Sequence, residues 1–335
     1  METVYFLGID ISKKTFQVAL TLDGINMVEG EVENKAPAIK HYFQGLREKF
    51  KFSPDQLIVC MEHTGIYCLP VLDYLTKAKI KVCVEPALQI KQSQGMTRGK
   101  SDRVDARRIA QYVYKNRLEL RFWQPQRAAI QKLKALLVLR ERLVKTKVQI
   151  EVPINESQEY IEESIRKTIL KNCQHTIKAL AKDIAKVEKE IQLLVEADCQ
   201  LSEQLKLAES VPGVGKITAL NVIISSAEFQ RISEAKRFAC YAGVAPFEHS
   251  SGSSIRGKTR VSKMANMTLK KLLHLAAMSA IQCCEELKTF YQRKVAEGKN
   301  KMSVINAVRN KLISRIFACI KNKRMYQKDY HHALA

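Results

Sequence analysis

The first 116 residues place short apolar runs and helix-like segments in an order that few folds accommodate. Three apolar runs come first, at 4–9, 16–22 and 25–32. The dipeptide Asp23-Gly24 separates the second run from the third, and Asp-Gly between two strand-like runs favours a tight hairpin. The opening of the chain therefore predicts a three-stranded antiparallel meander.

After the meander, helix-like and strand-like segments alternate. We expect a helix, a strand, a helix, a strand and a helix, in that order, at 36–50, 57–61, 66–78, 80–84 and 102–116. The resulting order, βββ-α-β-α-β-α, is that of ribonuclease-H-like domains, in which helices flank a mixed sheet. The predicted N-terminal fold class is therefore α/β.

The next part of the chain has a different composition and periodicity. Between about 126 and 207 there is no glycine and a single proline, Pro153, while Leu, Ile and Val recur at helical spacing. This pattern predicts two long amphipathic helices, broken near Pro153, that form an antiparallel coiled-coil-like arm. Dimerisation, spacing or nucleic-acid contact through its lysine-rich faces would suit such an arm. A solvated charged face is an equally good interpretation for any single lysine.

We divide the chain into three parts on these grounds. The N-terminal domain is expected at 1–122, the helical arm at 123–207, and a mainly helical C-terminal domain at 208–335. The last of these contains turn signals and small residues, and it ends in a basic helix at about 301–322.

Charge and composition limit the class of partner. Lys and Arg number 56 against 34 acidic residues, a formal charge of +22, which predicts attraction to polyanions. The nine cysteines form no CxxC pair, as expected of reduced thiols in a cytosol. The sequence contains neither a signal-peptide pattern nor an apolar run of the roughly 20 residues that cross a bilayer. We therefore expect a cytoplasmic nucleic-acid protein rather than a membrane-bound one.

Four acidic residues stand where a ribonuclease-H-like fold would bring them together. Asp10 ends the first strand, Glu62 follows the fourth, and Asp102 and Asp105 share one face of the last helix. Clustered carboxylates bind hard cations such as Mg²⁺ or Mn²⁺, and two such ions can clamp a phosphodiester during its displacement. Singly, each acid has a plainer role available, as a turn cap, a salt-bridge partner or a helix N-cap. Jointly, they predict a catalytic metal site.

A Pro-Gly-Val-Gly segment separates two helix-like stretches near 209–220. Gly213 and Gly215 resemble the turn of a helix-hairpin-helix element, whose backbone N–H groups bind a phosphate, and Lys216 adds charge. An ordinary turn between helices is the alternative. A P-loop is excluded because Ile217 follows Gly215-Lys216.

A serine- and glycine-rich segment, His249-Ser-Ser-Gly-Ser-Ser254, is predicted from the residues alone to be a polar, flexible loop. Cationic side chains that would bind a phosphate beside a serine hydroxyl follow it, at Arg256, Lys258, Arg260 and Lys263. Without further information, such a segment is more often only a loop.

The blocks described above resemble the DEDD transposases, an insertion-sequence family related to the Piv-type DNA invertases. The N-terminal resemblance lies in Gly8-Ile-Asp10, Glu62-His-Thr-Gly65-Ile-Tyr67 and Lys100-Ser-Asp102-Arg-Val-Asp105-Ala106. It implies a RuvC-like domain in which Asp10, Glu62, Asp102 and Asp105 are the four acids of the metal site.

The same resemblance extends to the serine segment and implies a nucleophilic serine that links to a DNA 5′ phosphate. The match falls on Ser251, with Ser250 and Ser253 as near alternatives. Ala265 departs from the family pattern, which usually has glycine before Asn266.

We therefore predict a transposase or site-specific recombinase that cleaves and rejoins DNA. The expected partners are DNA, a structured non-coding bridge RNA that the resemblance implies, and further copies of the chain in a dimer or tetramer. The alternatives are a metal-dependent junction resolvase or nuclease without a covalent intermediate, and a non-enzymatic architectural protein.

Overall fold

The computed structural model describes residues 4–93, 101–251, 255–262 and 264–328. The chain divides into two compact units, Met1–Pro125 and Gln126–Ala335. The division into three parts that we expect from the sequence stays a prediction. No helix in the described part of the chain is both long and apolar enough to span a membrane.

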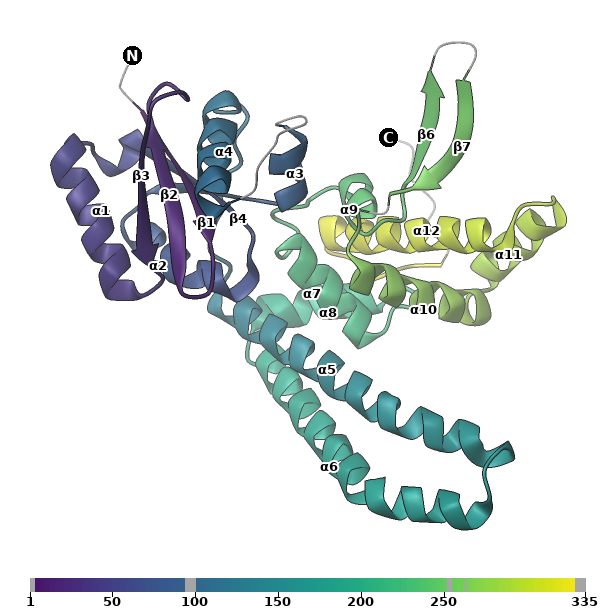
Figure 1. Cartoon of the computed structure of the whole chain (residues 1–335). Helices are drawn as coiled ribbons and strands as arrows, with labels where there is room; N and C mark the ends of the chain where they lie inside the picture. Colours follow the sequence, from purple (N-terminus) through teal and green to yellow (C-terminus); the bar gives the residue numbers. More distant parts are fainter. Residues whose placement is uncertain (1–3, 94–100, 252–254, 263, 329–335) are drawn as a thin grey trace. The chain divides into compact units, whose positions relative to one another are not determined.

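The first unit is built on a five-stranded sheet of order β3-β2-β1-β4-β5 (Figure 1). The β1–β2 and β2–β3 pairs are antiparallel, whereas β1–β4 and β4–β5 are parallel, which confirms the predicted mixed sheet. The strands are β1 (Tyr5–Ile11), β2 (Thr15–Thr21), β3 (Met27–Glu33), β4 (Leu57–Glu62) and β5 (Lys81–Glu85).

Helices cover both faces of this sheet because successive strand residues point to opposite sides. Leu7 and Ile9 pack with the apolar side chains of α1 and α2, whereas Phe6 packs on the other face with Ile109 and other residues of α4. The helices are α1 (Ala36–Phe50), α2 (Leu69–Lys77), α3 (Ala87–Gln92) and α4 (Asp102–Lys115), with short 3₁₀ turns at Pro54–Gln56 and Gly65–Cys68. The predicted order of helices and strands is confirmed.

Helix α4 approaches the sheet most closely at Gly8, in the middle of β1. A Cβ atom at this position would lie 2.2 Å from the backbone nitrogen of Ala110 and 2.3 Å from the carbonyl oxygen of Ala106. Ala19 of β2 packs against the same two alanines. Small side chains on both elements therefore let the helix backbone rest directly on the strand.

This contact predicts that Gly8→Ala strongly destabilises the first unit. The added methyl group meets backbone atoms that cannot rotate away, so α4 has to move off the sheet, and we expect unfolding to become easier by about 3 kcal/mol. Urea denaturation followed by circular dichroism measures the change. Gly30→Ala is the matched control, because its Cβ would lie 3.4 Å from the nearest atom, a side-chain carbon of Val18. Equal effects of the two substitutions would contradict the role given to Gly8.

The second unit begins with a long helical hairpin, α5 (Ala128–Glu156) and α6 (Glu163–Glu196). Near its base, apolar residues of both helices are buried against each other, among them Leu133 of α5 and Ile191 of α6. The break that we expect near Pro153 falls one turn later, because α5 continues through the proline to Glu156. A proline removes one hydrogen bond from a helix but does not force the residues after it out of the helical conformation.

The remaining helices pack around α12, which confirms the predicted basic helix at 301–322. Its side chains Val308, Leu312 and Ile316 are fully buried. The elements are α7 (Cys199–Glu209), α8 (Lys216–Ser226), α9 (Ala235–Tyr241), the hairpin strands β6 (Pro246–Ser251) and β7 (Ile255–Val261), α10 (Met267–Cys283), α11 (Glu285–Ala296) and α12 (Lys301–Asn322).

Candidate active site

Two of the four predicted acids lie at the ends of neighbouring parallel strands of the first unit: Asp10 is the last residue but one of β1, and Glu62 is the last residue of β4. Gly8 of β1 pairs with Cys60 of β4, and Asp10 and Glu62 lie two residues further along their strands. Because side chains alternate along a strand, Asp10 and Glu62 lie on the face of Gly8 and Cys60, which is the face that α4 covers. Both acids are half-buried.

The other two acids belong to the first turn of α4, and Ser101 caps the start of this helix. The Ser101 hydroxyl accepts a hydrogen bond from the Val104 N–H at 3.3 Å, and Asp102 is the first helical residue. Acidic residues suit this position because the first turn of a helix carries partial positive charge. Asp105 is half-buried, and its carboxylate accepts a hydrogen bond from Arg108 at 2.9 Å.

Asp102 is exposed and borders an open pocket of about 600 Å³ beside β2 and β3. Glu29 lines the same pocket, and its carboxylate accepts hydrogen bonds from Arg103 and Arg107. The other lining residues are Gln17, Gly30, Glu31, Ser101 and Arg103.

The fold thus supplies all four acids to one side of the sheet, from β1, β4 and the start of α4. Their donor atoms are all carboxylate oxygens, which hard cations such as Mg²⁺ prefer, so the donor set fits such an ion. Among the described residues, no three His, Cys, Asp or Glu side chains lie close enough together to hold a metal ion. Convergence of the four acids on one ion stays a prediction.

A fifth carboxylate at this edge was not expected from the sequence. Glu85 ends β5, pairs with Glu62, and therefore lies on the same face of the sheet. Burial raises the pKa of Glu85, and Arg121 partly opposes that shift. The sequence signal was available, because Glu85 directly follows a buried strand, as Asp10 and Glu62 do.

The glycine turn of the second unit joins α7 to α8, and its two glycines differ. Gly213 has φ of +82°, and a Cβ there would lie 2.6 Å from backbone atoms of Ala276 and Ala280 in α10. Gly215 is exposed, has open space around it and caps α8. The Lys216 ammonium donates a hydrogen bond to Gln192. Packing against α10 thus explains why residue 213 is glycine. The helix-hairpin-helix assignment stays a prediction.

The described part of the serine-rich segment, residues 249–251, is not the loop that we expect from its composition, and residues 252–254 lie outside the described residues. Residues 246–251 and 255–261 form the antiparallel strands β6 and β7, with Ser250 opposite Arg256 and Ser251 opposite Ile255. The loop expectation was wrong because it rested on polar composition, whereas interstrand hydrogen bonds need only backbone groups. Lys258 and Arg260 also belong to β7, and Ser253 and Lys263 lie outside the described residues.

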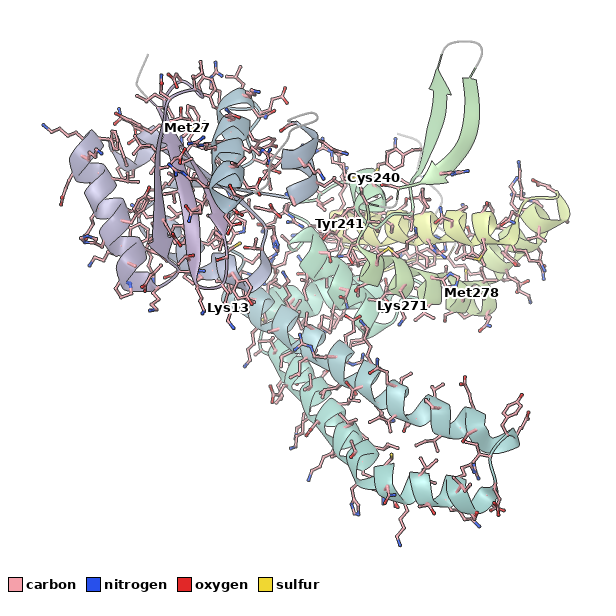
Figure 2. All side chains as sticks on the ribbon, in the orientation of Figure 1. Lys13, Met27, Cys240, Tyr241, Lys271 and Met278 are labelled. Atoms are coloured by element: carbon pink, nitrogen blue, oxygen red, sulfur yellow. The ribbon has the colours of Figure 1, made fainter. Side chains whose placement is uncertain are left out.

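Hydrogen bonds join both ends of this hairpin to neighbouring helices of the second unit. The side-chain amide of Asn306 donates to the Val244 carbonyl at 2.7 Å, just before β6. After β7, the Asn266 N–H donates to the carbonyl of Tyr241, at the end of α9 (Figure 2), over 3.0 Å. Gly243, with φ of +65°, leaves room between these points, because its Cβ would lie 2.3 Å from that of Ala265.

At Ala265 the sequence departs from the family pattern, yet the next residue, Asn266, still starts a regular helix. The Asn266 side chain accepts a hydrogen bond from the Leu269 N–H at 3.1 Å, so it caps α10.

Comparisons with known proteins cover most of the chain. The chain is 26% identical to the pilin gene-inverting protein of Moraxella bovis, over 97% of this chain and 98% of that protein. It is 25% identical to the transposase for insertion sequence element IS1111A of Coxiella burnetii, over 68% of each chain. A Thermus thermophilus RuvC structure in complex with a Holliday junction substrate covers 36% of this chain at 13% identity, with a TM-score of 0.29.

Two family models match separate parts of the sequence. A DEDD transposase model of the IS110 group matches residues 7–157, which include all four acids. A second model, described as the transposase IS116/IS110/IS902 family, matches residues 205–292, which include the glycine turn and the serine hairpin. The chain therefore belongs to the IS110 family of transposases and is a DNA transposase or recombinase.

Proposed function

We propose that this transposase is a site-specific recombinase of an insertion sequence, which cleaves and rejoins DNA through a phosphoserine at Ser251. The observation that carries the proposal is the placement of Asp10 and Glu62 on neighbouring parallel strands, on the face that α4 covers. The family model that spans these residues and Asp102 and Asp105 supports it.

The four acids form the metal-binding part of the proposed site. Asp10, Glu62, Asp102 and Asp105 hold a divalent cation, Mg²⁺ or Mn²⁺, which neutralises charge on the reacting phosphate when bound. The acids come from two strands and one helix of the same unit, so the fold of that unit determines their spacing.

Ser251 supplies the nucleophile. Its hydroxyl oxygen attacks a phosphorus of the DNA backbone, gives up its proton to a base, and displaces the 3′ oxygen, which leaves as a 3′ hydroxyl after taking up a proton. The 5′ phosphate is then esterified to the serine. In the rejoining step, a 3′ hydroxyl from another strand attacks this phosphorus and releases Ser251. Each of the two steps breaks one P–O ester bond and forms another, so the reaction needs no external energy source.

Cationic groups position the nucleic acid in this proposal. Arg256, Lys258, Arg260 and Lys263 follow Ser251 and bind phosphates next to the cut strand. The exposed Gly215 and the first turn of α8, with Lys216 beside it, hold a phosphate further along the DNA. Gly213 acts indirectly, by seating the turn on α10.

A structured non-coding RNA and further copies of the chain complete the proposed assembly. Recombination handles several strands at once, so two or four protomers each supply one serine. The charge of +22 provides attraction for RNA and DNA together.

Replacing the nucleophile tests the covalent step. On DNA that carries the ends of the element, with RNA transcribed from its flanks, we expect the wild-type protein to form a covalent adduct that survives denaturing electrophoresis. Ser251→Ala should form none, while Ser250→Ala, its matched control, should keep adduct formation within about tenfold. Loss of the adduct in Ser250→Ala alone would move the nucleophile to that residue. Cleavage without any adduct would instead favour a hydrolytic nuclease or junction resolvase.

The metal site has a test that does not depend on cleavage. Calorimetric titration with Mn²⁺ should detect binding to the wild-type protein and a loss of at least about tenfold in affinity for Asp10→Asn, because one charged ligand is removed. Asp73→Asn is the control, since Asp73 is an exposed acid on α2 that pairs with Lys77. The same affinity in all three proteins would exclude Asp10 as a ligand.

The glycine turn allows stability and DNA binding to be separated. Gly213→Ala should lower the melting temperature by several degrees, because a positive φ disfavours alanine by about 1–2 kcal/mol and the methyl group meets α10. Gly215→Ala should lower the melting temperature less, because its φ is negative and open space surrounds it, so that only the poorer N-cap costs stability. It should weaken DNA binding, since it puts a side chain where a phosphate approaches. Unchanged DNA affinity of Gly215→Ala would remove this turn from the DNA interface.

A further inference from the structure

One face of α6 carries a row of lysines that the proposed reaction does not use. Lys171, Lys178, Lys182 and Lys189 are separated by seven, four and seven residues. At about 100° per residue these spacings place all four within about 40° of one another around the helix axis. The row, called here the lysine stripe, extends about 27 Å along α6.

The lysine stripe points away from the other helix of the arm. The side chains of α6 that are buried near α5, Val187, Ile191 and Val195, lie about 120–160° from the centre of the stripe around the axis. Figure 2 shows nitrogen-tipped side chains along the side of α6 that is turned away from α5. All four lysines are exposed, so their ammonium groups are available to a partner.

Acidic side chains do not neutralise this row. Among the described residues, none forms a salt bridge with the four lysines, whereas Lys167 and Lys186 of the same helix pair with Glu163 and Asp183. The acids between the ends of the stripe, Asp183 and Glu188, and Glu190 directly after it lie about 100° or more from its centre around the axis. On a solvated helix surface, positively and negatively charged side chains are commonly interspersed, whereas on α6 they lie on different faces.

The geometry points to a nucleic-acid backbone bound along the length of α6. A duplex presents one phosphate per about 3.4 Å of axis on each strand, a regular row of negative charge with the same linear form as the stripe. Lysines about 6–10 Å apart each reach a different phosphate, because their side chains are long and flexible. The helical backbone of α6 already holds the four lysines on one face, so little order has to be created on binding.

This inference rests on the proposed function only in that the enzyme has nucleic-acid partners. DNA and RNA backbones share the phosphate chemistry that the stripe recognises. A non-specific backbone contact of this kind holds a duplex in place and does not read its sequence.

The test compares two full-length variants with the same loss of charge. The stripe variant carries Lys171→Gln, Lys178→Gln, Lys182→Gln and Lys189→Gln. The control variant carries Lys132→Gln, Lys134→Gln, Lys145→Gln and Lys147→Gln, at positions scattered around α5. Each lowers the formal charge by four, from +22 to +18, and glutamine keeps a good helix propensity. Circular dichroism and melting temperature verify that both variants fold.

Binding is measured by fluorescence anisotropy at several salt concentrations, with a DNA duplex and an RNA duplex of about 20 base pairs, each longer than the stripe. We expect the stripe variant to bind at least about tenfold more weakly at about 100 mM salt. Its slope of log affinity against log salt should become less steep by about 3 to 4 on DNA. The control variant should change the slope by less than about 1.

A loss with both duplexes, or with only one of them, supports the inference and in the second case identifies the partner. Equal behaviour of the stripe and control variants on both duplexes would overturn it. Neither result depends on strand cleavage. Absence of a Ser251 adduct in the wild-type protein would therefore count against the proposed reaction alone.

Discussion

The contact between Gly8 and α4 determines whether the first unit can present its acids together. With no side chain at Gly8, the backbone of α4 rests on β1 beside Ala106 and Ala110. The same helix begins at Asp102, so the distance between strand and helix also sets the distance between two pairs of acids. The same contact therefore packs the core of the first unit and sets the geometry of the candidate site.

The serine hairpin depends on a comparable contact in the second unit. Gly243 and Ala265 touch because neither has a side chain beyond Cβ, and the strands leave this point fastened by Asn306 and by the backbone of Tyr241. The anchored end of the hairpin belongs to the helical core, whereas Ser251 ends the strand that leads away from it. These contacts fix the position of the hairpin's base relative to the helices that carry it.

Charge is distributed unevenly over a chain with a formal charge of +22. On the α4 side of the sheet, arginines pair with acids, as Arg108 does with Asp105. On α6, the lysines of the stripe stand apart from the acids of the same helix. Net charge alone indicates a polyanionic partner, but only the helix geometry indicates where along the chain that partner is held.

The sequence by itself determined the order of strands and helices, the two-helix arm and the family, because these depend on local periodicity and short motifs. It also predicted the four acids of the metal site, since each stands at the end of a predicted strand or in the first turn of a predicted helix. Only the tertiary structure distinguished Gly213, which packs on α10, from the open Gly215, and showed Ser250 and Ser251 in a strand paired with β7. It likewise brought Glu85 beside Glu62. These features depend on contacts between segments distant in sequence, which local patterns do not encode.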